Sequence, residues 1–124
     1  MVQEYIKDPY LIDGLKFDIR LYVLVTSAEP LKVFLYQDGL VRFATEKYSN
    51  KMNSTNMQNM FVHLTNYSVN KMNPGFKNSQ SLDDDSGHKR SWLTVLRRLE
   101  QEGRNIKEIN HKIKDIIVKT LLTI

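Results

Sequence analysis

The chain has 124 residues, of which 41% are hydrophobic and 26% are charged, so one small globular domain is expected and wholesale disorder is excluded. It contains no cysteine, which excludes disulfide scaffolds, thiolate metal sites and cysteine nucleophiles. No apolar run approaches the roughly 20 residues of a membrane helix, and the N-terminus lacks the pattern of a signal peptide. We therefore expect an intracellular protein without membrane insertion.

The formal charge of +4 is unevenly distributed along the chain. Residues 1–88 carry nine Lys and Arg against ten Asp and Glu, whereas residues 89–124 carry nine basic residues against four acidic ones. A basic surface of this kind suits nucleic acid, an anionic membrane or an acidic protein, and it is equally typical of a solvated helix face. Charge alone does not choose among these partners.

The clearest strand pattern covers residues 17–25, in which every odd position is apolar. It ends in a turn that contains a proline. The dipeptide Asp38-Gly39 is typical of a two-residue hairpin turn and would separate two further strands, 31–37 and 40–44. The pattern predicts a three-stranded antiparallel meander over about residues 16–44.

Residues 46–81 are rich in asparagine, which favours turns and side-chain bonds to the backbone, so this stretch is predicted to be mostly coil. One short apolar piece inside it, Phe61–Leu64, has the pattern of a strand. The acidic run Asp83–Asp85 with the following Ser-Gly predicts an exposed loop.

Two helices are predicted in the last third of the chain. Apolar residues at positions 92, 95, 96 and 99 have helical spacing, and Gly103 supplies a C-terminal stop. Asn105 is placed to cap the next helix, with Glu108 at the third position as in a capping box. The predicted fold class is therefore α+β, with a meander, a long Asn-rich coil and two C-terminal helices. Its apolar faces lack partners within the chain.

Three charged residues alternate along the first strand. Lys16, Asp18 and Arg20 have side chains that point the same way, about 6.6 Å apart. Cations that flank a carboxylate suit a polyphosphate site, and mutual ion pairing on a solvated sheet is the ordinary alternative. Arg42 alone is typical of an edge residue whose charged head reaches the solvent. Thr65-Asn66 is equally consistent with a turn or a helix cap. No glycine-rich phosphate loop, GxSxG or HExxH motif is present, which excludes Rossmann and P-loop nucleotide binding.

The strings KFDIRLYVLV and HLTNYS, with IIVKTL near the end, resemble the tubulin tyrosine ligase-like enzymes, and most closely their polyglutamylase branch. The resemblance runs from about Val2 to Leu122. Members of this family are similar to ATP-grasp carboxylate–amine ligases, which use ATP and Mg²⁺ to join an amino acid to a tubulin carboxylate through an acyl-phosphate. The resemblance implies that residues 1–124 are part of such an ATP-grasp catalytic core, without its upstream and downstream parts.

The resemblance also assigns roles to individual residues. It implies that Arg20 and Arg42 are the catalytic cations near the terminal phosphate and the acyl-phosphate. It implies that Lys16 and Asp18 contact the nucleotide, with Asp18 near the ribose. Further ATP contacts are implied for the hinge strand at the adenine, Gln3, Glu4, Tyr5 and Ile6, and for Thr65 and Asn66 of the HLTN motif. The family's Mg²⁺ ligands have no match, so they are expected outside this chain, which by itself should be inactive.

The implied function is ATP-dependent addition of glutamate to glutamate side chains of tubulin, represented here by a fragment of the core. The expected partners are free glutamate and the acidic C-terminal tails of tubulin or microtubules, in the cytoplasm, the microtubule cytoskeleton, and a cilium or basal body. The alternatives are a non-catalytic remnant of the family and a tubulin glycine ligase. A nucleic-acid module is disfavoured, because the strand aromatics alternate into the predicted sheet instead of forming an exposed stacking platform.

Overall fold

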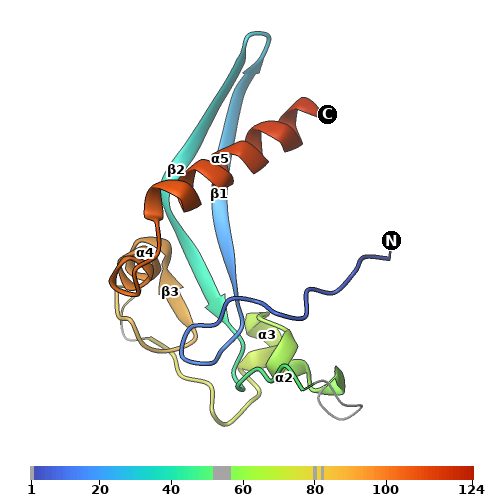
Figure 1. Ribbon diagram of the computed structural model, residues 1–124, viewed down its shortest axis with the longest axis vertical. Helices are drawn as coiled ribbons and strands as arrows, with labels where there is room; N and C mark the ends of the chain where they lie inside the picture. Colours follow the sequence, from blue (N-terminus) through green and yellow to red (C-terminus); the bar gives the residue numbers. More distant parts are fainter. Residues whose placement is uncertain (1, 52–56, 80, 82) are drawn as a thin grey trace.

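The computed structural model describes residues 2–51, 57–79, 81 and 83–124 (Figure 1). Two long strands, β1 (Phe17–Ala28) and β2 (Leu31–Phe43), form an antiparallel hairpin. A short third strand, β3 (Lys89–Ser91), pairs antiparallel with the C-terminal end of β2, at residues 40–42, so the order in the sheet is β1-β2-β3. The helices of the described residues are α2 (Met60–His63), α3 (Tyr67–Asn70), α4 (Trp92–Gln101) and α5 (Ile106–Leu122).

The α+β class and a three-stranded antiparallel sheet are confirmed, but the predicted meander is wrong in two respects. The hairpin turns at Glu29-Pro30, where the proline turn was predicted, but the second predicted turn is absent: Asp38-Gly39 lies inside β2, at an irregularity in its register with β1. The third strand comes from β3, far along the chain. Gly39 serves close packing here, because a Cβ atom at this position would lie 2.4 Å from the carbonyl oxygen of Arg20.

The segment that was predicted as a short strand, Phe61–Leu64, is helical over most of its length. Residues Met60–His63 form the single turn α2, and the Asn59 side chain caps it by accepting from the N–H of Phe61 at 3.0 Å. This cap favours a helix over a strand in so short a piece. The remainder of 46–81 is mostly irregular, as predicted, apart from 52–56 and 80, which lie outside the described residues.

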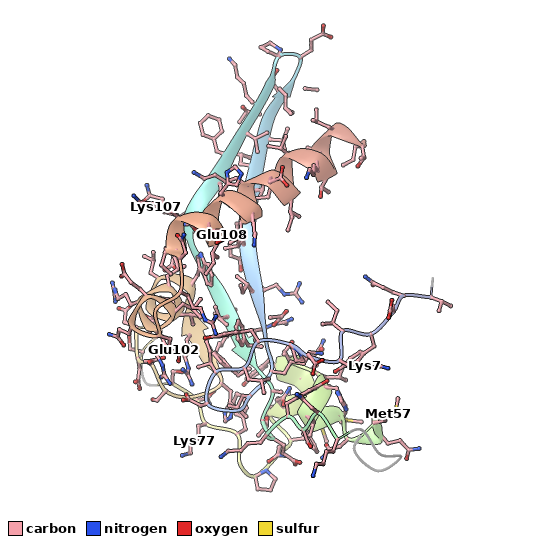
Figure 2. The ribbon with its side chains drawn as sticks, in the orientation of Figure 1. Lys7, Met57, Lys77, Glu102, Lys107 and Glu108 are labelled. Carbon is pink, nitrogen blue, oxygen red and sulfur yellow. The ribbon has the colours of Figure 1, made fainter. Side chains whose placement is uncertain are left out.

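The two predicted helices, the Gly103 stop and the Asn105 cap are confirmed, whereas the Glu108 side chain pairs with Lys112 and not with the N–H that a capping box would use. Gly103 ends α4 with φ 79°, a conformation that glycine adopts readily. Asn105 caps α5 by accepting from the N–H of Glu108 at 3.2 Å. The Glu108 carboxylate pairs with Lys112 at 2.6 Å, which is one turn further on. Figure 2 shows Lys107 and Glu108 at the start of α5.

The helices α4 and α5 cover one face of the sheet. Trp92, Val95 and Leu99 of α4 join Val41 and Phe43 of β2 in the buried core. The partly buried side of α5 packs against the same cluster as the helix crosses the hairpin (Figure 1). On the opposite face, the outer half of the hairpin is exposed at Tyr22, Leu24, Phe34 and Tyr36. In the described part of the chain, no helix is both long and apolar enough to cross a membrane.

A cluster of ion pairs joins α4 to two loops, one that contains Asp13 and one that contains Asp85. The buried guanidinium of Arg90 bonds Asp85 at 2.7 Å, and Arg98 bonds Asp13 at 2.8 Å and Asp85 at 3.0 Å. Arg98 also bonds Glu102 at 2.8 Å, a residue that Figure 2 labels. We call these five residues the helix-side cluster. The hydrogen bonds that Arg98 donates to Asp13, Asp85 and Glu102 raise the pKa of Arg98, so its charge is permanent.

Candidate functional site

The candidate site lies where the start of β1, the end of β2 and the start of β3 meet, on the face of the sheet opposite α4 and α5. The antiparallel register places Asp18 opposite Arg42, and Arg42 opposite Lys89. Side chains of directly opposed residues share a face, so these three form one row across the sheet. Arg20 stands two residues beyond Asp18 on β1 and therefore shares this face. We call Asp18, Arg20, Arg42 and Lys89 the charged row.

Asp18 is the centre of the charged row. Arg42 donates to its carboxylate from Nε at 3.2 Å and from Nη2 at 2.8 Å, and Arg20 donates from Nε at 3.2 Å. Partial burial by itself would raise the pKa of Asp18, but hydrogen bonds from Arg42 and Thr65 and the charges of both arginines lower it. The bond to Asp18 also raises the pKa of Arg42. The row therefore carries three cations and one anion at neutral pH.

Lys16 connects the N-terminal arm, residues 2–11, to the start of β1. Its Nζ donates to the carbonyl oxygen of His63 at 3.1 Å and to the hydroxyl of Tyr5 at 3.3 Å. The Tyr5 hydroxyl is also hydrogen-bonded to Nδ1 of His63 at 2.7 Å. Tyr48 donates to the carbonyl oxygen of Lys7 at 2.7 Å, and Figure 2 labels Lys7 on the arm. These contacts hold the arm beside the charged strand.

A buried asparagine holds the HLTN segment against the end of β2. Asn70 is 1% exposed, and its Nδ2 donates to the carbonyl oxygens of Leu64 at 2.8 Å and Asn66 at 3.0 Å. Its Oδ1 accepts from the backbone N–H of Thr45 at 3.0 Å and from the Thr45 hydroxyl. Because every polar atom of this amide is bonded, Asn70 fixes the turn that brings Thr65 to the charged row.

The structure brings together six of the ten residues to which the resemblance assigned a role: Tyr5, Lys16, Asp18, Arg20, Arg42 and Thr65. Asn66 is exposed, and its side chain makes no cap bond at the start of α3. Gln3, Glu4 and Ile6 lie on an exposed arm without regular secondary structure, so the described residues form no hinge strand there. The roles of all ten residues stay predictions.

Sequence reasoning missed three residues of this region: His63, Asn70 and Lys89. His63 is the first residue of the HLTN motif and Asn70 follows that motif by four residues, and these positions could have indicated them. Lys89 had no local signal, because β3 is three residues long and pairs with a strand far earlier in the chain. It was counted only as part of the basic C-terminal third.

The charged row is suited to anions and not to a metal ion. Among the described residues, no group of three or more His, Asp and Glu could hold a metal. Asp18 is the one carboxylate of the row, and both of its oxygens accept hydrogen bonds from arginines. Mg²⁺ requires several oxygen ligands in near-octahedral geometry, which the row does not supply.

The two arginines, one lysine and one carboxylate on the open face of a small antiparallel sheet give this face an excess of positive charge. Over residues 1–124 the sequence matches the tubulin-tyrosine ligase family, and the chain belongs to that family. This confirms the resemblance that the KFDIRLYVLV and HLTNYS strings indicated.

Three relatives illustrate the similarity. The chain is 49% identical over 124 residues to the "Probable beta-tubulin polyglutamylase" of Tetrahymena thermophila, covering 99% of this chain and 10% of that protein. It is 48% identical over 123 residues to tubulin monoglutamylase TTLL4 of Mus musculus, covering 99% of this chain and 10% of the relative. It is 47% identical over 124 residues to tubulin polyglutamylase TTLL7 of Mus musculus, covering 98% of this chain and 13% of the relative. The chain thus spans about a tenth of the length of these relatives.

Proposed function

We propose that the protein is an ATP-dependent ligase that adds glutamate to glutamate side chains of tubulin through an acyl-phosphate, and that these residues are part of its ATP-grasp core. The names of the relatives support the substrate class. The observation that carries the proposal is the charged row, in which three cations and one carboxylate lie together on an open face. Bringing a phosphate and a carboxylate together requires such an excess of positive charge.

Arg20 and Arg42 are the proposed catalytic cations for the terminal phosphate and the acyl-phosphate. The Arg42 side chain is 18% exposed and is fixed by Asp18, whereas the Arg20 side chain is 55% exposed. A guanidinium held in place before substrate binds does not have to be ordered during the reaction, so Arg42 is the better placed of the two. ATP supplies the phosphoryl group that activates the carboxyl.

Asp18 has two compatible roles in this proposal. It orients both arginines through Oδ2, which accepts from each of them, and Oδ1, which accepts from Arg42, is the oxygen proposed to accept from a ribose hydroxyl as well. Lys16 and Thr65 stand on either side of it and are the proposed nucleotide contacts nearest to the row.

The arm is the proposed adenine end of the site. A groove of about 550 Å³ is lined by Gln3, Glu4, Tyr5, Ile6, Lys7 and Asp8. Tyr5 links this groove to Lys16, and the exposed Asn66 completes the proposed ATP contacts. No step is assigned to Mg²⁺, whose ligands are expected outside these residues. Free glutamate, tubulin tails and a microtubule or ciliary location belong to the same proposal.

The proposal is tested with the complete product of the gene. We expect it to incorporate labelled glutamate into microtubules when ATP is supplied, with the label on glutamate side chains of the tubulin tails by mass spectrometry. Tubulin without its tails is the matched control and should take up no label. Incorporation of glycine in place of glutamate would identify a glycine ligase. Incorporation of neither amino acid would favour a non-catalytic member of the family.

A further inference from the structure

A second groove continues the charged row toward the outer half of the hairpin. It has a volume of about 350 Å³, and its lining residues are Tyr22, Tyr36, Asp38, Gly39, Leu40 and Lys89. Leu40 is the cross-strand partner of Arg20 and stands two residues from Arg42 on β2. Residues two apart on a strand share a face, so the floor of this groove lies on the same face as the charged row.

Lys89 differs from the arginines of the row because it forms no ion pair with any described residue. Its Nζ lies 5.5 Å from the centroid of the Tyr67 ring, which is a cation–π contact. The side chain borders this groove and also the small hollow that Arg42 and Thr65 line. An ammonium group held by an aromatic ring but without a counter-ion is suited to bind an anion.

The walls of the groove indicate what kind of anion it would take. Leu40 supplies an apolar floor, and the rings of Tyr22 and Tyr36 are exposed beside it. A carboxylate on a short aliphatic stem would use both the cation and this floor, whereas a triphosphate would leave the floor without a contact. The volume lies in the range of sites for small organic ligands, roughly 300–1,000 Å³.

We propose that Lys89 binds a carboxylate of the glutamate substrate, with the methylene groups of that glutamate over Leu40. This assignment rests on the proposed function, since it places one reactant next to the arginines that would hold the activated carboxyl. Free glutamate and a glutamate residue of the tubulin tail present the same chemistry. Both sources would meet the same cation, so the kinetics must separate them.

The test compares Lys89→Ala with Lys71→Ala in the complete protein. Lys71 is the matched control, because its Nζ lies 5.7 Å from the centroid of the same Tyr67 ring and it does not line the groove. We expect Lys89→Ala to raise the KM of one carboxylate substrate by about tenfold or more and to leave the KM of ATP within about twofold. Lys71→Ala should change neither. A rise for free glutamate or for the tail peptide identifies which of the two binds.

Two further variants guard against a folding defect. Lys89→Met keeps an unbranched stem over the ring and removes only the charge, and Lys89→Arg restores the charge. We expect Lys89→Met to behave as Lys89→Ala does, with an unchanged melting temperature, and Lys89→Arg to recover most of the affinity. A rise confined to the KM of ATP, or no change in any KM, would overturn the assignment.

Failure of the proposed function is recognised separately, from the unsubstituted protein. If that protein joins no amino acid to tubulin, glutamate binding is measured directly by calorimetry with the unsubstituted protein and with Lys89→Met. Weaker binding by the variant would support the role of Lys89 without ligation. Equal binding, or no binding by either protein, would overturn it.

Discussion

The two ionic clusters on either side of the sheet use the same residue types in opposite proportions. In the helix-side cluster, Arg90 and Arg98 share three carboxylates. In the charged row, Arg20 and Arg42 share the single carboxylate of Asp18, and Lys89 adds a third cation opposite Arg42. Lys89 and Arg90 are neighbours in β3, yet their side chains join different clusters because successive residues of a strand point to opposite faces. Charge balance and exposure, and not residue type, separate a cluster that holds loops from one that can hold a ligand.

The largest expected effect is the loss of activity on removing Arg42. In the complete protein, Arg42→Ala is expected to abolish glutamate incorporation, a loss of at least about a hundredfold, because a preorganised charge at the reacting groups is removed. The fold should survive, since Arg20 still pairs with Asp18. Arg97→Ala, an exposed arginine of α4, is the matched control. Incorporation at the native rate by the Arg42 variant would contradict the proposed role of the row.

Removing Arg90 should have the opposite outcome, a loss of stability. Its side chain is 4% exposed and lies 4.3 Å from the Phe43 ring centroid, so Arg90→Ala leaves a void and an incompletely paired Asp85. We expect urea unfolding to give a free energy of unfolding lower by about 2–3 kcal/mol. The neighbouring Lys89→Ala should cost less than about 1 kcal/mol. Equal losses for the two variants would remove the distinction between the clusters.

Nucleotide affinity tests the polar side of β1. Lys16→Ala and Asp18→Ala are each expected to weaken ATP binding by about tenfold in calorimetry, since each removes a charged contact or the group that orients two arginines. Their melting temperatures should stay close to the native value. Lys32→Ala, at the exposed end of the hairpin, serves as control. A large fall in melting temperature with unchanged ATP affinity would mean that Asp18 and its arginines form a purely structural ion pair.

The smallest expected effect is a pH dependence in the helix-side cluster. The hydrogen bond from Arg98 lowers the pKa of Asp13 from its usual 3.8, so its stabilisation is complete above that value and is lost as the pH falls through the lowered pKa. Asp13→Asn should therefore be less stable at pH 7, by under about 1 kcal/mol because the side chain is 46% exposed. The gap should close in stronger acid. The control Asp83→Asn, in an exposed loop, is expected to be as stable as the unsubstituted protein at both pH values. A stability difference for Asp13→Asn that persists unchanged in acid would refute the linkage.

The elements that the sequence predicted correctly are those with a complete local signal. β1, α4 and α5 each have a periodic apolar pattern, and Gly103 and Asn105 mark helix ends by their own conformational and hydrogen-bonding properties. The proline turn at Glu29-Pro30 was predicted correctly, but a second turn was predicted wrongly, because Asp38-Gly39 carries the same local signal whether glycine is needed for a turn or for a close approach of two backbones. Only the register distinguishes these cases, and register depends on the partner strand.

For the candidate site, alternation along one strand was enough to predict that Lys16, Asp18 and Arg20 share a face. It was not enough to find Lys89, whose place in the row depends on a strand pairing that no local pattern encodes. The contribution of Asn70 was hidden for a different reason. Other asparagines stand close by at positions 66 and 73, and only tertiary contacts show which amide is buried.

In the proposed function, the charged row couples the folding of the sheet to its ligand. Arg20 and Arg42 already lie together in the β1–β2 hairpin, and Lys89 joins them only when β3 pairs with β2, so repulsion between like charges opposes that step. An anion bound at the row offsets the repulsion and binds only the assembled sheet. At a hundred times its dissociation constant, such a ligand stabilises the native state by about 2.7 kcal/mol. The proposed function therefore predicts that a ligand bound at the row also stabilises the short β3 edge, so that ligand concentration would act on the local stability of this edge.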